Sequence, residues 1–199
     1  SIRSTGLDMQ TEDEQIAQLK DWWDRNGKPL LAGGVLALVA VFGWQGWQKY
    51  QDNQAQGASV LYQQLLEAAL DPAGKPDAAK VAELAGKLNS EFAGTHYAQY
   101  GSLFVAKVAV EANRLDDAAA ALQRVLDKPA DATLGELARQ RLARVLAAQD
   151  KADDALKLLD AKVEEAFLAS REELKGDLLV QLGRSDDAHA AYQKAKDAL

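Results

Sequence analysis

The chain is poor in the residues that carry much of enzyme chemistry. Its 199 residues include no cysteine and only two histidines, His96 and His189. The lack of cysteine excludes disulfides, thiolate metal sites and cysteine nucleophiles. The two histidines are far apart in sequence, and neither has neighbours at the spacing of a metal site. We therefore expect both to be structural or surface residues, and we expect no metal site.

Common catalytic and phosphate-binding motifs are missing as well. The sequence has no Gly-x-Ser-x-Gly, no His-Glu-x-x-His and no phosphate-loop pattern, and Gly33-Gly34 lies inside an apolar run. Paired aspartates at 116–117, 153–154 and 186–187 are alternative acid–base candidates, but their recurrence at expected helix starts is more typical of helix caps. The sequence thus predicts a protein that is not an enzyme and takes no cofactor.

Basic residues are also scarce in the larger part of the chain. From residue 51 onward, 18 Lys and Arg stand against 24 Asp and Glu, which leaves a net charge of −6. Binding to nucleic acid requires a basic face for the phosphates. This acidic balance therefore argues against nucleic acid as a partner.

One apolar run stands out in this polar sequence. Residues 30–44 read LLAGGVLALVAVFGW, and a helix over 29–48 would span roughly 30 Å, the thickness of a bilayer's hydrocarbon core. Lys28 precedes it, and Trp44, Trp47 and Tyr50 stand where an interfacial aromatic belt would lie. The alternative, a cleaved signal peptide, requires small residues at a cleavage site, whereas Gln45-Gly46-Trp47-Gln48 follows here. The run predicts a transmembrane helix over 29–48 in a lipid bilayer.

Basic residues near this segment predict its orientation. Lys20, Arg25 and Lys28 precede it, whereas Lys49 is the only basic residue after it until Lys75. Positively charged flanks stay in the cytoplasm. We therefore expect a cytoplasmic N-terminus and a C-terminal domain on the other side of the membrane.

The residues before the apolar run predict two short segments. Met9 is the only methionine, so we expect residues 1–8 to be a leader foreign to the natural chain, unless a native start was lost upstream. Residues 9–28 predict a cytoplasmic amphipathic segment, with a Thr11–Glu14 capping box and a helix that ends at Asn26-Gly27. The apolar face of this helix would be formed by Ile16, Leu19, Trp22 and Trp23. The alternative is a partly ordered polar leader.

Small residues recur within the predicted transmembrane helix. Gly33, Ala37, Ala40 and Gly43 follow one another at spacings of four, three and three, which places them on one side of a helix. A neighbouring transmembrane helix could approach closely along such a side. We treat these four residues as a candidate transmembrane partner face, although small residues are also common in single spans that have no partner.

A repeated pattern occupies the C-terminal half. Asp-Asp-Ala occurs at 116–118, 153–155 and 186–188, with alanines 37 and 33 residues apart, and each copy is expected to open a helix with a carboxylate cap. A second small residue stands twelve positions before each alanine. The repeat-packing positions predicted in this way are Ala106, Ala118, Ala143, Ala155, Gly176 and Ala188.

The register of these positions over residues 95–199 resembles the tetratricopeptide repeat, in which a small residue on one helix lets its partner pack closely. Helical segments at 51–70 and from Asp77 onward precede it, with turns at 71–76 and 90–95, and we expect Asp77 to cap the second of these helices. The fold expected for residues 49–199 is thus an all-α, tetratricopeptide-like α-solenoid of about four helix pairs after a single N-terminal transmembrane helix. The alternative is an ordinary alanine-rich helical domain.

Residues 13–47 also resemble the start of YfgM-type proteins, through Trp22-Trp23, Asn26-Gly27-Lys28 and Gly43-Trp44. The later segments 141–160 and 174–192 are similar to the repeats of that family. The resemblance implies an ancillary subunit of the SecYEG translocon in the bacterial inner membrane, with a periplasmic repeat domain. It implies a PpiD-type periplasmic chaperone and emerging polypeptide clients as partners, but no particular binding residues.

Two other functions remain open for such a chain. An anchored repeat protein can be a scaffold for another envelope assembly, and the family has also been linked to restraint of a stress-response regulator. An enzyme is disfavoured because its motifs are missing. Co-purification of partners in mild detergent would distinguish a translocon subunit from an unrelated scaffold.

Overall fold

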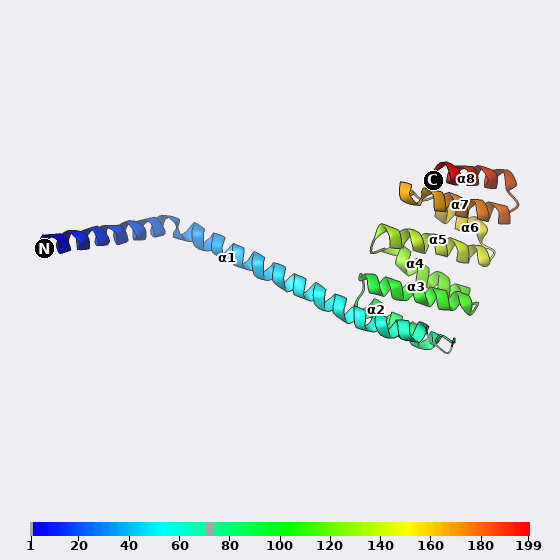
Figure 1. Ribbon diagram of the computed structural model, residues 1–199, viewed down its shortest axis with the longest axis horizontal. Coiled ribbons are helices and arrows are strands. Elements are labelled where there is room, and N and C mark those ends of the chain that lie inside the picture. Colours follow the sequence, from blue (N-terminus) through cyan, green and yellow to red (C-terminus); the bar gives the residue numbers. More distant parts are fainter. Residues whose placement is uncertain (1, 71–73) are drawn as a thin grey trace. The chain divides into compact units, whose positions relative to one another are not determined.

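The computed structural model describes residues 2–70 and 74–199, with side chains from residue 11 onward. All regular secondary structure in these ranges is helical (Figure 1), which confirms the predicted all-α class. Ser1 of the predicted leader and residues 71–73 of the predicted turn lie outside the described residues. The chain divides into two compact units, Ser1–Asp52 and Asn53–Leu199, here called unit 1 and unit 2.

Eight helices are formed by the described residues. They are α1 (Ile2–Ala69), α2 (Ala78–Glu91), α3 (His96–Glu111), α4 (Leu115–Asp127), α5 (Ala132–Ala148), α6 (Ala152–Leu159), α7 (Glu165–Gln181) and α8 (Ser185–Asp197).

Unit 1 consists of the first part of α1. The turn predicted at Asn26-Gly27 is wrong, because the helix continues through it and through Pro29. The indole of Trp23 covers Gly27, which is buried among exposed neighbours and has no Cβ to obstruct the ring. This contact between residues four apart favours a continued helix, at the cost of the one backbone hydrogen bond that a proline cannot donate.

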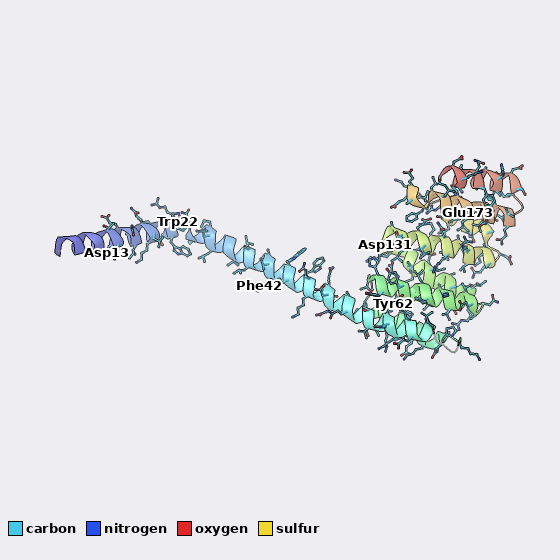
Figure 2. All side chains as sticks on the ribbon, in the orientation of Figure 1. Asp13, Trp22, Phe42, Tyr62, Asp131 and Glu173 are labelled. Carbon is cyan, nitrogen blue, oxygen red and sulfur yellow. The ribbon has the colours of Figure 1, made fainter. Side chains whose placement is uncertain are left out.

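The apolar part of α1 lies uncovered within its unit. Helix residues 11–69 contain a stretch long and apolar enough to cross a membrane, and no part of that stretch is buried. Leu36, Val39 and Phe42 are each more than 60 % exposed, and Figure 2 shows Phe42 on this bare part of the helix. Exposing so much apolar surface to water is unfavourable, whereas placing it in an apolar environment is favourable.

Unit 2 is a stack of helix pairs (Figure 1), which confirms the predicted solenoid. Residues 53–69 of α1 pair with α2, followed by α3 with α4, α5 with α6, and α7 with α8. Each apolar cluster also joins one pair to the next: Leu65, Leu84 and Ala98 meet in the first cluster, for example. Shared clusters of this type give a repeat stack one continuous core.

Side chains that accept backbone N–H groups begin three of these helices. Asp77 accepts from the backbone N–H of Lys80 at 3.1 Å, as predicted, and Thr95 caps α3. Asp131 accepts from Leu134 N–H at 2.7 Å, and this bond, together with the bond to His96, keeps the pKa of Asp131 below its ordinary value.

The paired aspartates do not act as the predicted caps. Arg114, Lys151 and Arg184 occupy the cap positions of α4, α6 and α8, and no side chain caps these helices. The aspartates lie in the first turn, where their charge favours the helix dipole. Two of them bind the arginine at the cap position instead, as in the 3.1 Å pair of Asp117 and Arg114.

A second recurring feature explains this shift. The residue before each of these cap positions is left-handed, with φ of 57° at Asn113, 60° at Asp150 and 74° at Gly183. The same tight turn therefore connects the two helices in each of three successive pairs. Glycine, asparagine and aspartate are the residues that tolerate this conformation best.

An ion pair is buried between α5 and α7. Arg171 is 1 % exposed and donates through Nε to Glu136 Oε1 at 3.0 Å. Its Nη1 donates to the carbonyls of Leu159 and Ala161, at the end of α6. Burial alone would raise the pKa of Glu136, but hydrogen bonds from Arg171 and Gln140, with the charges of Arg171 and Arg139, hold it below its ordinary value. The pair thus joins three helices of successive repeats.

Candidate functional site

Two adjoining pockets open on unit 2, beside α3 and α5. The first has a volume of about 440 Å³ and lies among α3, α4 and α5. The second, of about 280 Å³, lies among α1, α3 and α5. We call these two pockets together the groove. It is lined by Tyr62, Tyr100, Leu103, Phe104, Ala106, Lys107, Val110, Glu111, Leu115, Leu122, Leu137, Arg141, Arg144, Val145 and Ala148.

Aromatic rings form one end of the groove. Tyr62, labelled in Figure 2, projects from α1, and its ring centroid lies 5.5–6.2 Å from those of Tyr97, Tyr100 and Phe104 on α3. Burial, with smaller contributions from Tyr100 and Tyr97, raises the pKa of Tyr62. The cluster is an amphipathic surface that can pack apolar groups and still donate hydrogen bonds through its hydroxyls.

Three cations stand on the walls of the groove. Lys107 on α3 and Arg141 and Arg144 on α5 are exposed. None of them forms a hydrogen bond or ion pair with residues 2–70 or 74–199. Glu111 is the one carboxylate among the lining residues. The groove therefore combines an apolar floor with an excess of positive charge, although the domain as a whole is acidic.

The residues selected from the sequence lie elsewhere. Ala106, Ala118, Ala143, Ala155 and Ala188 are at most 3 % exposed, and they lie inside the stack. Gly176 is buried against Tyr192, whose ring occupies the space that a Cβ would need. Only Ala106 also reaches the groove.

The candidate partner face in the apolar part of α1 is uncovered. Ala37 and Ala40 are exposed, and no side chain lies within 4 Å of a Cβ built on Gly33 or Gly43. His96 Nε2 lies 3.0 Å from Asp131 Oδ2. No cluster of His, Asp and Glu in the described ranges has the form of a metal site.

The sequence favours the first helix of each pair, near residues 103–110, 137–146 and 174–182, as a peptide-binding face. The first two of these segments line the groove, but sequence reasoning missed its pockets and its cations. The signal was present on α3, where Tyr97, Tyr100, Phe104 and Lys107 follow at spacings of three and four. On α5, Leu137, Arg141 and Arg144 repeat this spacing. Each row reads as an ordinary helix face, and only the packing of α3 against α5 shows that the two rows border one hollow.

The fold and the groove define a class of protein: a helical-repeat binding domain that follows an apolar helix long enough to cross a membrane. Comparison with known proteins agrees with this. The family model for a tetratricopeptide repeat-like domain matches residues 20–199.

Relatives of similar length narrow the assignment. The chain is 35 % identical over 184 residues to the "Ancillary SecYEG translocon subunit" of Escherichia coli (strain K12). The matched region covers 92 % of this chain and 86 % of the relative. Proteins of the same name in Haemophilus influenzae and Neisseria gonorrhoeae are 30 % and 31 % identical, over 94 % of this chain and 89 % and 88 % of their own. The chain belongs to this family of ancillary translocon subunits, as the sequence resemblance predicted.

Proposed function

We propose that this chain is a non-enzymatic accessory subunit of the SecYEG translocon that holds polypeptide in its groove. The relatives' shared name supports the translocon as the partner complex. By resemblance to the family, the polypeptide bound is an emerging client or part of a PpiD-type periplasmic chaperone.

The groove is the observation that carries this proposal. Its floor exposes apolar and aromatic side chains such as Val110 and Leu137, which are 45 % and 36 % exposed. Exposed apolar surface within a concave site is typical of binding surfaces. Helical-repeat stacks use such surfaces to hold extended or helical segments.

The membrane anchor gives this binding its location. A single span in the inner membrane keeps the repeat domain in the same bilayer as the translocon, which raises the effective concentration of one near the other. Lys20, Arg25 and Lys28 favour a cytoplasmic N-terminus. Unit 2 then lies in the periplasm, where translocated segments emerge.

Side-by-side contact within the bilayer is the second part of the proposal. Gly33, Ala37, Ala40 and Gly43 leave one side of α1 without bulky side chains. A translocon or chaperone helix can approach that side closely. Association then has two components, one through the span and one through the groove.

Co-purification from membranes in mild detergent tests the proposal. The parent chain should recover SecYEG and a periplasmic chaperone. A Val110→Asp/Leu137→Asp variant should lose the chaperone or client, because a charge on the apolar floor opposes burial. The matched control is Val60→Asp/Val180→Asp, since both valines are exposed and neither lines the groove.

Two results would overturn the proposal. The parent chain failing to recover any translocon component would assign it to another envelope assembly. Equal partner recovery by the groove variant and the control would show that the groove is not the binding surface.

A further inference from the structure

The two pockets of the groove share one wall. Leu103, Lys107 and Arg141 line both of them, so the two cations stand where the pockets meet. On one side of this wall the floor is formed by Ala106, Leu122 and Val145. An occupant of both pockets must therefore pass the Lys107 ammonium and the Arg141 guanidinium.

The floors on either side suit large apolar side chains. Leu122 is 1 % exposed and Val145 6 %, so the first pocket reaches down to the core between α3 and α5. The second pocket is bordered by Tyr62, Tyr100 and Leu137. One apolar side chain buried in each pocket would add favourable binding free energy on both sides of the two cations.

The cations between the pockets are available to an anion. Some cations of unit 2 are paired, as Arg114 is with Asp117 and Arg184 with Asp187. Lys107 and Arg141 have no such partner in the described ranges. An apolar segment without an anion would leave both charges partly desolvated and unpaired, which is costly.

We infer that the groove selects segments in which a carboxylate lies between two large apolar side chains. This inference rests on the proposed function and adds the chemistry of the bound polypeptide. In an extended segment, residues i, i+2 and i+4 point to the same side. A pattern such as Leu-x-Glu-x-Leu would place the carboxylate at Lys107 and Arg141 and one leucine in each pocket.

A polypeptide fits this arrangement better than a lipid does. The apolar surfaces lie on both sides of the two cations, so the ligand must carry its charge in the middle. A phospholipid carries its charge at one end of its apolar part, and it would fill one pocket only. Arg144, three residues from Arg141 on α5, adds positive charge at the first pocket, which also holds Glu111, the one carboxylate of the lining.

Peptide binding to the full chain in phosphatidylcholine nanodiscs tests this inference. Fluorescein-labelled Gly-Leu-Ala-Glu-Ala-Leu-Gly, its Gln counterpart and its Lys counterpart are titrated and followed by anisotropy. We expect the Glu peptide to bind about tenfold more tightly than the Gln peptide, and the Lys peptide to bind most weakly. The preference should shrink as salt is added.

Charge-removing variants locate the effect. In Lys107→Gln/Arg141→Gln the affinity for the Glu peptide should fall to the affinity for the Gln peptide. The Gln peptide itself should bind this variant and the parent equally well. The matched control, Lys157→Gln/Lys196→Gln, removes two exposed charges from α6 and α8 and should keep the preference. Circular dichroism checks that both variants keep the parent's helix content.

The outcomes separate this inference from the proposed function. If the Glu and Gln peptides bind the parent equally well, the inference is wrong while polypeptide binding in the groove stands. If no peptide binds, the proposed function fails together with it. Displacement of the Glu peptide by phosphatidylglycerol nanodiscs would assign the cations to lipid, and loss of a parent oligomer in Lys107→Gln/Arg141→Gln would assign them to a second copy of the chain. Either result would overturn the inference.

Discussion

Arg171 is among the largest side chains that the repeat domain buries completely, although it carries a charge. Its guanidinium satisfies Glu136 on α5 and two carbonyls at the end of α6. Replacing a buried pair by apolar residues is often harmless, whereas removing one partner leaves an uncompensated charge. This ion pair therefore links the third helix pair, α5 and α6, to the fourth, α7 and α8. Its loss should lower the free energy of unfolding.

Replacing Arg171 with Met should destabilise the chain by about 3–5 kcal/mol at neutral pH. The deficit should depend on pH. In the parent, the lowered pKa of Glu136 contributes stability that is present above the unfolded pKa of about 4.3 and is lost as the pH falls through the lower, folded pKa. In Arg171→Met the buried Glu136 loses its arginine partner, so acidification should relieve its unpaired charge.

The gap between parent and variant should therefore narrow as the pH falls from neutral towards the pKa of glutamate. Urea unfolding followed by circular dichroism at several pH values measures this gap. The double variant Arg171→Met/Glu136→Gln serves as control, because it lacks the titrating group. Its gap to the parent should stay nearly constant from neutral pH down to the unfolded pKa of glutamate and narrow only below it. A gap of equal size at every pH in Arg171→Met would contradict this account of the pair.

A second residue-scale prediction compares Ala143 with Asp153. Ala143 is 0 % exposed, within the cluster that joins α5, α6 and α7. Ala143→Trp should cost about 1–3 kcal/mol or more, because the packed helices have no space for the ring. Asp153→Ala should cost less than about 1 kcal/mol, since it removes only a charge that favours the dipole. Melting temperatures of the two variants test this, and equal small shifts would mean that the repeat register is misplaced.

Single residues show where sequence reasoning succeeds and where it stops. Asp77 could be predicted as a cap because an Asp directly before residues with helical apolar spacing is a common N-cap. The recurring turn at Asn113, Asp150 and Gly183 was missed because three different residues adopt the same left-handed conformation. Once this turn is present, the next residue becomes the cap and the aspartates move into the first turn.

At the scale of elements, α1 contributes to both units. Its residues Ala58 and Leu65 are fully buried in the cluster that also holds Val81, Leu84 and Leu88 of α2. Gly57 faces Phe92 so closely that a Cβ there would lie 2.6 Å from the ring. The end of α1 is thus the first helix of the repeat stack.

Two truncations test this role of α1. A fragment that begins at Asn53 should be soluble and helical and should melt cooperatively, because its first pair is complete. A fragment that begins at Lys75 should be unstable or aggregate, since it exposes the apolar face of α2. Far-UV circular dichroism and light scattering measure both. A stable, monomeric fragment from Lys75 would show that residues 53–69 are dispensable.

The apolar part of α1 allows a second test at this scale. Replacing Gly33, Ala37, Ala40 and Gly43 together with leucine keeps the segment apolar but fills its small side. We expect normal membrane insertion and reduced recovery of the translocon or chaperone in mild detergent. A matched variant with Val35, Leu38 and Val41 changed to alanine leaves the small side as it is. Unchanged recovery in the four-leucine variant would make the span an anchor only.

Elements were predicted well where their pattern repeats. The apolar periods before and after the three Asp-Asp-Ala copies predicted three helix pairs, and the helical segments at 51–70 and from Asp77 onward predicted the first pair. The break at Asn26-Gly27 was wrong because Gly, Asn and Pro in sequence normally signal a turn. The local contact between Trp23 and Gly27 opposes that signal, and such contacts are not visible in composition.

At the scale of the whole molecule, the main prediction concerns topology. Lys20, Arg25 and Lys28 before the apolar segment favour a periplasmic unit 2. Protease added to intact spheroplasts should therefore digest the chain beyond Tyr50, while a cytoplasmic marker protein stays protected. Complete protection of unit 2 would reverse the orientation and exclude periplasmic clients.

The shape and the charge of the groove are the features that the sequence could not provide. Lys107 and Arg141 are 34 residues apart, and their proximity depends on how α3 packs beside α5. Leu103 and Leu122 were visible as apolar residues, but whether such residues fill the core or leave a pocket depends on side-chain volumes across several helices. A family resemblance gives the fold in such a case without its binding chemistry.

The order of contacts along unit 2 has a consequence for biogenesis. Helices contact their neighbours in sequence, or the helix two places away, and the described helices form no contact between the two ends of the stack. Chains dominated by such local contacts fold fast. The first pair can therefore close around Leu65 and Leu84 while later repeats are still being synthesised. Each newly added pair then finds a finished surface to fold against, and no stage requires the C-terminus to return to the start.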